Sequence, residues 1–124
     1  AYAEHQGAFG LVCNAFITEE AIRAIKETVE IPLVYTVVSE QADVAGKLAA
    51  GVDFLNVSGA ARTPEIVAHI REIFPEVPII ASGGKTGESI AETIAAGANA
   101  ITYTPPTSAE LFAESMRKYR GKFA

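Results

Sequence analysis

A pair of glycines between a predicted strand and a predicted helix is the feature of this sequence with the clearest chemistry. In the segment Val77–Thr86, a buried apolar run ends in Gly83-Gly84, and a helix is expected to begin just beyond Lys85. Glycines let a ligand approach the backbone closely because no Cβ intervenes, and the first amides of a helix attract an anion. The Lys85 ammonium could add a positive charge to a bound phosphate. The alternative is that Gly83-Gly84 forms only a tight turn and that Lys85 is solvated.

A second glycine turn is also a candidate anion site. Ser58-Gly59 ends another apolar run, and Arg62 and Thr63 follow at a predicted helix start. A guanidinium suits phosphate and carboxylate groups. A plain loop explains the same residues equally well, so both interpretations stay open.

Four further polar residues lie in or at the ends of predicted strands and are possible substrate-binding residues: Asn14, Thr36, Asn56 and Ser82. None of them is an acid or a base, and no complete acid–base pair is found at the strand ends. The catalytic residues therefore stay unassigned. No His/Cys/Asp cluster has metal-ligand spacing and no GxGxxG motif is present, so neither a metal nor a cofactor is predicted.

Five apolar runs of strand length alternate with segments of helical periodicity and must position these residues. The predicted strands are Phe9–Ala15, Leu33–Val38, Phe54–Val57, Ile79–Ser82 and Ala100–Tyr103. The predicted helices are Glu19–Val29, Glu40–Ala50, Pro64–Phe74, Glu88–Ala96 and Ala109–Tyr119. The expected N-caps are Thr18, Thr63, Thr86 and Ser108, and the expected C-caps are Gly51 and Gly97.

The strands are continuously apolar, which is typical of parallel strands covered on both faces. Residues 1–124 are therefore interpreted as one domain of five strand–helix units with right-handed crossovers. An internal repeat supports this organisation, because Pro32 and Pro78 are 46 residues apart and Gly51 and Gly97 keep the same offset. The repeating unit would be two strand–helix pairs.

The sequence PIIASGG, followed by AAGANAI and a polar strand end, resembles strands seven and eight of the phosphate-binding (βα)8 barrels. That superfamily includes histidine-biosynthesis barrels, related aldolases and prenyltransferase-type barrels. The resemblance implies that Gly83 and Gly84 supply phosphate-binding amides and that Thr104 lies on the strand-eight side of the same phosphate. The sequence departs from the family at Lys85 and at Pro105-Pro106, where two prolines remove amide donors.

The third predicted strand resembles the sixth strand of the phosphogluconate-type aldolases. Those enzymes carry a Schiff-base lysine where this sequence has Asn56. Because an amide cannot form a Schiff base, that chemistry is not expected at this position. Asn56 could instead orient a polar ligand, or it could form a hydrogen bond with the neighbouring backbone.

Two folds and two functions follow from these observations. The chain is either the last five units of a (βα)8 barrel, and so a fragment of a larger protein, or a five-stranded doubly wound sheet of the flavodoxin-like type. The corresponding functions are a phosphate-binding portion of an isomerase or lyase that acts on a small phosphorylated carbon compound, and a non-catalytic phosphate-ligand sensor.

Composition limits the partners. A net charge of -5 argues against non-specific nucleic-acid binding, and the apolar runs are too short to span a bilayer. The single cysteine, Cys13, fits a reducing cytoplasm. Five units leave two open sheet edges, so a homo-oligomer is expected.

Overall fold

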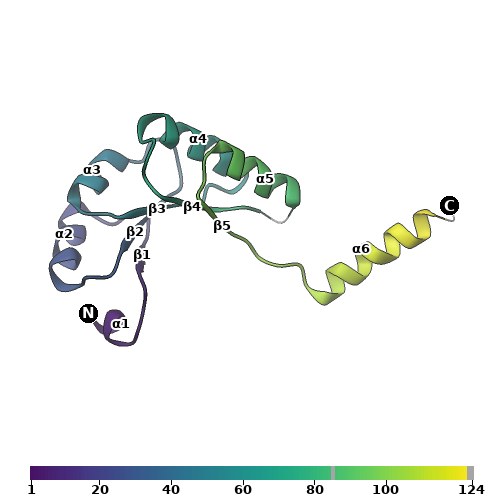
Figure 1. Cartoon of the computed structure of the whole chain (residues 1–124), viewed down its shortest axis with the longest axis horizontal. Coiled ribbons are helices and arrows are strands. Elements are labelled where there is room, and N and C mark those ends of the chain that lie inside the picture. The colour runs from purple at the N-terminus through teal and green to yellow at the C-terminus, as the bar shows by residue number, and fades with distance from the viewer. Residues whose placement is uncertain (85, 123–124) are drawn as a thin grey trace.

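The computed structural model describes residues 1–84 and 86–122 and has one parallel sheet of five strands (Figure 1). The strands are β1 (Leu11–Cys13), β2 (Leu33–Val37), β3 (Phe54–Val57), β4 (Ile79–Ser82) and β5 (Ala100–Thr102). Every neighbouring pair is parallel. This confirms the predicted five parallel strands, although β1 is shorter at both ends than the predicted strand.

The five predicted helices alternate with these strands, and the structure adds a short helix before the first strand that was not predicted. The helices are α1 (Tyr2–His5), α2 (Glu19–Thr28), α3 (Val44–Ala50), α4 (Thr63–Ile73), α5 (Gly87–Ala96) and α6 (Ser108–Gly121), and a short 3-10 helix, η1 (Ala60–Arg62), precedes α4. The caps at Thr18 and Thr86 are confirmed, since their side chains accept hydrogen bonds from the amides of Ala21 and Ser89.

Three local predictions were wrong. The helix predicted from Glu40 begins only at Val44, because the Asp43 carboxylate accepts the Gly46 amide and caps the helix there. Thr63 does not cap α4: its hydroxyl accepts a hydrogen bond from the Gly59 amide, which lies before the helix.

The third error concerns α6, whose cap is Thr107 and not Ser108. The Thr107 hydroxyl accepts a hydrogen bond from the Glu110 amide at 3.1 Å. Ser108 is therefore already the first residue of the helix.

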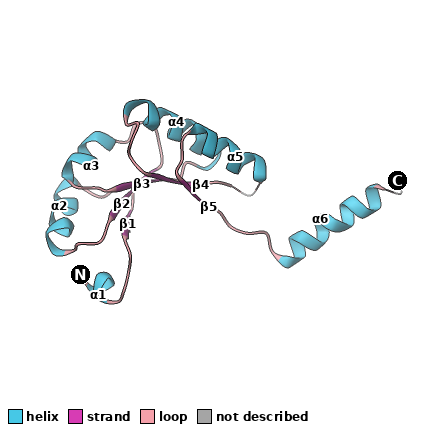
Figure 2. Ribbon diagram, viewed as in Figure 1, coloured by secondary structure: helices cyan, strands magenta, loops and turns pink. Residues whose placement is uncertain are grey.

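The strand order decides between the two predicted folds. The strands lie in the sequential order β1-β2-β3-β4-β5. A flavodoxin-like sheet would have the order 2-1-3-4-5, so that alternative is excluded. Helices α2 to α5 all lie on one side of the sheet, as in the wall of a (βα)8 barrel (Figure 2). The fold is therefore an open portion of such a barrel.

The core lies between the sheet and these four helices. Alternate strand residues, among them Leu33, Leu55 and Ile79, are fully buried on the helix side, where Ile22 and Ile66 meet them. In the described part of the chain, no helix layer covers the opposite face of the sheet (Figure 2), and the side chains of that face become more exposed toward the edges. No helix in residues 1–84 or 86–122 has the length and hydropathy needed to cross a membrane.

Candidate functional site

A cavity of about 290 Å³ lies where β4 and β5 end, at the carboxyl edge of the sheet. Its lining residues are Ser82, Gly84, Thr102, Tyr103 and Thr104. Three of them, Ser82, Gly84 and Thr104, are among the predicted site residues. Thr102 and Tyr103 were not predicted, although their place at the end of the fifth strand was a signal that could have identified them.

Gly83 has a structural role beside this cavity. Its amide donates a hydrogen bond to the Thr102 carbonyl at 2.9 Å, so it takes part in strand pairing. A Cβ at this position would lie 2.4 Å from Ile101 Cγ2 and 2.9 Å from Ile90 Cγ1. Glycine therefore allows α5 to pack closely against β5, and this packing accounts for Gly83 without reference to a ligand.

Gly84 has a different constraint. Its backbone φ is +74°, a value that residues other than glycine rarely adopt. A Cβ added at this position would also lie 2.6 Å from Ser89 Oγ. The Ser89 hydroxyl in turn donates to the Gly83 carbonyl at 2.6 Å. The loop therefore turns sharply toward α5, and Gly84 leaves the cavity wall without a side chain. Lys85, the predicted cationic contact, lies outside the described residues.

Four predicted residues form two polar rows near the same edge, on the sheet face that α2 to α5 leave uncovered. Ser58 and Ser82 share a hydrogen bond of 2.8 Å between their hydroxyls, which joins β4 to the residue that follows β3. Thr36 and Asn56 are paired in the register of β2 and β3, with 3.4 Å between Asn56 Nδ2 and Thr36 Oγ1. The structure thus brings together polar side chains that are up to 46 residues apart in sequence.

At the second candidate anion site, around Gly59 and Arg62, carboxylates surround the cation, unlike at the β4–β5 cavity. The Arg62 guanidinium forms ion pairs with Glu40 and Glu65, at 2.5 and 2.9 Å. The neighbouring cavity of about 100 Å³ also includes Glu40 in its wall. Two carboxylates already neutralise the cation, so an anion would have to displace them.

Asn14 and Cys13 lie at the end of β1, apart from the other polar residues. Asn14 Oδ1 accepts the Phe16 amide at 2.9 Å, which closes a local turn. Burial raises the pKa of the Cys13 thiol, which disfavours the reactive thiolate. Neither residue has a partner at the β4–β5 cavity in the part of the chain described.

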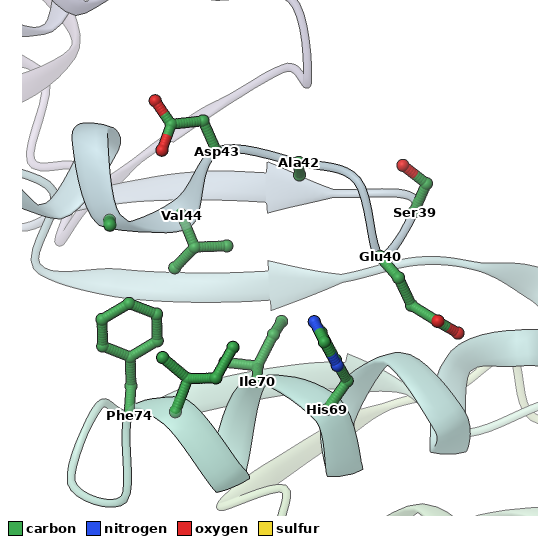
Figure 3. Close-up of a pocket in the computed structure, with 10 residues that line it drawn as sticks. Ser39, Glu40, Ala42, Asp43, Val44, His69, Ile70 and Phe74 are labelled. Carbon is green, nitrogen blue, oxygen red and sulfur yellow. The ribbon is translucent and has the colours of Figure 1, made fainter.

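A separate cavity of about 180 Å³ lies between α3 and α4, on the outer side of the helix layer (Figure 3). Val44, Ile70 and Phe74 give it an apolar wall, and His69 and Glu40 lie near one end. Glu40 is engaged with Arg62. Asp43, which also lines this cavity, accepts the Gly46 amide as the cap of α3. Both of its carboxylates therefore already have partners within the protein.

Comparison with known proteins supports the fold alone. No protein-family model matches the chain, and no curated protein matches it. Among solved structures, a mandelate oxidase variant with (S)-mandelic acid matches 84 % of this chain with a TM-score of 0.65 and 17 % identity. The native structure of KDPGal matches 84 % of it with a TM-score of 0.61 and 21 % identity. A protein described as a phosphonomutase from Burkholderia cenocepacia matches 96 % of it with a TM-score of 0.60 and 16 % identity.

The match covers 43 %, 48 % and 58 % of those three proteins, respectively. The chain thus spans about half the length of the solved proteins that it resembles. This proportion agrees with the open sheet, which has five strands where a closed (βα)8 barrel has eight.

Proposed function

We propose that the cavity at the ends of β4 and β5 binds the phosphoryl group of a small phosphorylated carbon compound. The chain would then be the phosphate-binding portion of a (βα)8-barrel enzyme of the isomerase or lyase type. The observation that carries this proposal is the position of the cavity, between the last two strands of the sheet at their carboxyl edge. Ligands bind at that edge in barrels, and phosphate often binds after the last two strands.

The wall of the cavity has suitable chemistry for a phosphate. Ser82, Thr102, Tyr103 and Thr104 carry hydroxyls that can donate hydrogen bonds to phosphate oxygens. Among the described residues that line the cavity, none carries a carboxylate that would repel an anion. The helix α5 follows closely and has ten residues, so the positive end of its dipole lies near the loop that carries Gly84.

The polar rows extend this site across the sheet. Ser58 follows β3 and shares a hydrogen bond with Ser82, and Asn56 lies in β3, two residues before Ser58. A substrate with its phosphate in the cavity could therefore extend over β3 and β2, where Asn56 and Thr36 offer further polar contacts. In this proposal the cavity fixes the phosphate and the rows orient the carbon skeleton.

A sensor function is the second candidate, and one specific observation favours it. Within the part of the chain that the structure describes, the residues that line the cavity carry no carboxylate, imidazole or ammonium group that could act as a general acid or base near neutral pH; Lys85, which follows Gly84, lies outside that part. If the chain acts as an enzyme, these groups come from strands that complete the barrel. Phosphate binding without turnover by any longer form of the protein would favour the sensor.

Titration with inorganic phosphate, followed by NMR of backbone amides, tests the proposed site. We expect amide shifts in residues 82 to 87 and in Thr102 and Thr104 of the wild-type protein. Gly84→Val should abolish these shifts, because its Cβ would meet Ser89 Oγ at 2.6 Å and force the loop at the cavity to change its shape. Since this variant is also strained at its positive φ, Thr104→Val is the second test, and it should weaken phosphate binding severalfold without loss of the fold.

The matched control is Thr28→Val at the exposed end of α2, remote from the cavity. It removes the same hydroxyl and should leave phosphate binding unchanged. If phosphate shifts no amide in this region, or if Thr104→Val binds phosphate as well as Thr28→Val, the proposed site is wrong.

A further inference from the structure

The face of the sheet that α2 to α5 leave uncovered consists of two chemically different layers. Residues of this face alternate along each strand with the core residues of the helix side. The layer nearer the amino-terminal ends of the strands is apolar and contains Val12, Val34 and Phe54, which are neighbours in the strand register. The layer nearer the carboxyl edge is polar and contains Thr36, Asn56, Ser58, Ser82 and Thr102. A ligand at the carboxyl edge would therefore contact the polar layer.

The polar layer carries no charge. None of the described strands, β1 to β5, contains an acidic or basic residue. Arg62, which follows β3 by a few residues, is already paired with two carboxylates. Transfer of a carboxylate from water to a surface without a cation is unfavourable. The strands thus offer no positive charge to neutralise a carboxylate on the carbon chain of a ligand.

Asn56 has an unused acceptor in this layer. Its Nδ2 donates to Thr36 Oγ1 at 3.4 Å, whereas its Oδ1 accepts no hydrogen bond from the described residues. Because no buried side-chain oxygen or nitrogen of the described residues lacks a partner, Asn56 Oδ1 must be accessible from outside the sheet. The Thr36 hydroxyl accepts from Asn56 and can still donate its own hydrogen. The pair therefore offers an acceptor and a donor side by side.

The two serines leave similar groups unused. One hydroxyl of Ser58 and Ser82 donates to the other at 2.8 Å, so one hydroxyl hydrogen of the pair is free to bind a ligand. A hydroxyl group on a ligand both donates and accepts and so matches both pairs. A carboxylate only accepts, and an alkyl group does neither.

We propose that the carbon chain of the phosphorylated ligand is uncharged and carries hydroxyl groups, and that Asn56 and Thr36 select for one of these hydroxyls. That hydroxyl donates to Asn56 Oδ1 and accepts from Thr36, while Ser58 and Ser82 contact a hydroxyl nearer the phosphate. The inference rests on the proposed function, because it takes the cavity after β4 and β5 as the phosphate site.

The spacing of the strands limits the length of this carbon chain. Neighbouring strands lie about 4.8 Å apart, so β3 is roughly 7 Å from a point between β4 and β5. A short carbon chain with its phosphate in the cavity spans this distance and brings its hydroxyls over Ser58 and Asn56. An apolar chain of the same length would displace water from these groups without replacing its hydrogen bonds, which is unfavourable.

Three ligands with the same phosphate group test the chemistry of the carbon chain. Glycerol phosphate carries hydroxyls, propyl phosphate lacks them, and phosphoglycerate has a carboxylate at its far end. In NMR titrations of the wild-type protein, the Kd of glycerol phosphate should be about three- to tenfold lower than that of propyl phosphate, as expected for about one net hydrogen bond. Phosphoglycerate should bind more weakly than glycerol phosphate. Equal Kd values for glycerol phosphate and propyl phosphate, or tighter binding of phosphoglycerate, would overturn the inference.

Asn56→Leu tests the role of Asn56 in this selection. The variant should raise the Kd of glycerol phosphate to that of propyl phosphate and leave the Kd of propyl phosphate unchanged. The isosteric Thr36→Val variant should lose part of the same preference. The control is Gln6→Leu, which removes a side-chain amide from the exposed end of α1 and should change neither Kd. If Asn56→Leu changes both Kd values by the same factor, Asn56 has only a structural role and the inference is wrong.

The same titrations separate this inference from the proposed function. If propyl phosphate and inorganic phosphate shift amides at the cavity but hydroxyls add no affinity, only the inference fails. If none of these phosphates shifts an amide there, the proposed function fails and the inference fails with it.

Discussion

Asp53 and Asn99, which are 46 residues apart, accept equivalent hydrogen bonds at the amino-terminal edge of the sheet. Asp53 Oδ2 accepts the Leu33 amide at 2.8 Å, and Asn99 Oδ1 accepts the Ile79 amide at 2.9 Å. Leu33 and Ile79 begin β2 and β4 and have the same 46-residue offset. Each side chain thus ties the start of its own strand to the preceding strand.

A basic side chain completes both arrangements. Lys26 Nζ donates to Asp53 Oδ2 at 2.8 Å, and Arg71 Nη2 donates to Asn99 Oδ1 at 2.9 Å. The predicted repeat of two strand–helix pairs therefore has a physical counterpart in the structure. Because these contacts lie at the edge opposite the cavity, we infer that they serve stability and leave the carboxyl edge free for a ligand.

The first prediction concerns the contribution of Asp53 to stability. Asp53→Ala leaves the Leu33 amide without its acceptor and Lys26 without its partner. We expect the free energy of unfolding in urea to fall by about 1–2 kcal/mol. The control is Glu27→Ala on the exposed side of α2, which should change it by less than about 0.5 kcal/mol. Equal losses in the two variants would contradict this role for Asp53.

A pH dependence follows from the same residue. Burial alone would raise the pKa of Asp53, but the hydrogen bonds from Lys26 and from the Leu33 amide outweigh it and hold the pKa below the ordinary value of 3.8. The folded state thus favours the carboxylate. The stabilisation is complete above the pKa of the unfolded state and is lost as the pH falls through the lower folded pKa.

Asp53→Asn tests this dependence because it copies the chemistry of Asn99. Urea unfolding measured between pH 6 and pH 2 should show a smaller loss of stability for Asp53→Asn than for the wild type at the acid end. An unchanged slope in the variant would mean that other carboxylates account for the acid sensitivity.

The sequence predicted the alternation of elements well because the signals for it are local. Apolar runs and cap residues such as Thr18 and Thr86 depend on neighbours within four positions. The start of α3 was predicted wrongly because both Glu40 and Asp43 are acidic residues in a polar stretch, and only the structure shows that Asp43 caps the helix whereas Glu40 contacts Arg62. The choice of barrel over flavodoxin-like order also required the structure, since strand order is a long-range property.

The candidate site was predictable only in part. The place of Ser82 and Gly84 at a strand end followed from the pattern, and both line the cavity. The neutralisation of Arg62 was not predictable, because Glu40 lies 22 residues away in sequence. The packing role of Gly83 was not predictable either, because the atoms that would clash with a Cβ there belong to Ile90 and Ile101, which are not its neighbours in sequence.

Gly83→Ala tests that packing role. The added methyl would meet Ile101 and Ile90, and we expect a loss of about 1–3 kcal/mol in the free energy of unfolding. Gly87→Ala at the start of α5 meets open space, so it should leave stability unchanged or slightly raise it. Thermal unfolding followed by circular dichroism distinguishes the two. If both alanines were tolerated equally, close packing would not explain Gly83.

The hydrogen bond between Ser58 and Ser82 predicts a measurable coupling. In a double-mutant cycle of Ser58→Ala and Ser82→Ala, the change in unfolding free energy of the double variant should differ from the sum of the two single changes by about 0.5–1 kcal/mol. For phosphate binding, Ser82→Ala should have the larger effect because Ser82 lines the cavity. Strict additivity would show that the hydroxyls act independently.

The last prediction concerns the charge at Lys85 and rests on its place in the sequence, directly after Gly84. If the Lys85 ammonium interacts with the bound phosphate mainly through charge, Lys85→Ala should weaken phosphate binding severalfold at low salt and much less at high salt, because ions screen an exposed pair. Lys118→Ala removes the same charge from α6, where Lys118 pairs with Glu114 at 3.1 Å, and should not affect phosphate binding at either salt concentration. Calorimetric titration in low and high salt measures both variants. A loss that is the same at the two salt concentrations would point to a role for Lys85 in shaping the loop, and no loss at all would show that the hydroxyls and amides bind phosphate without it.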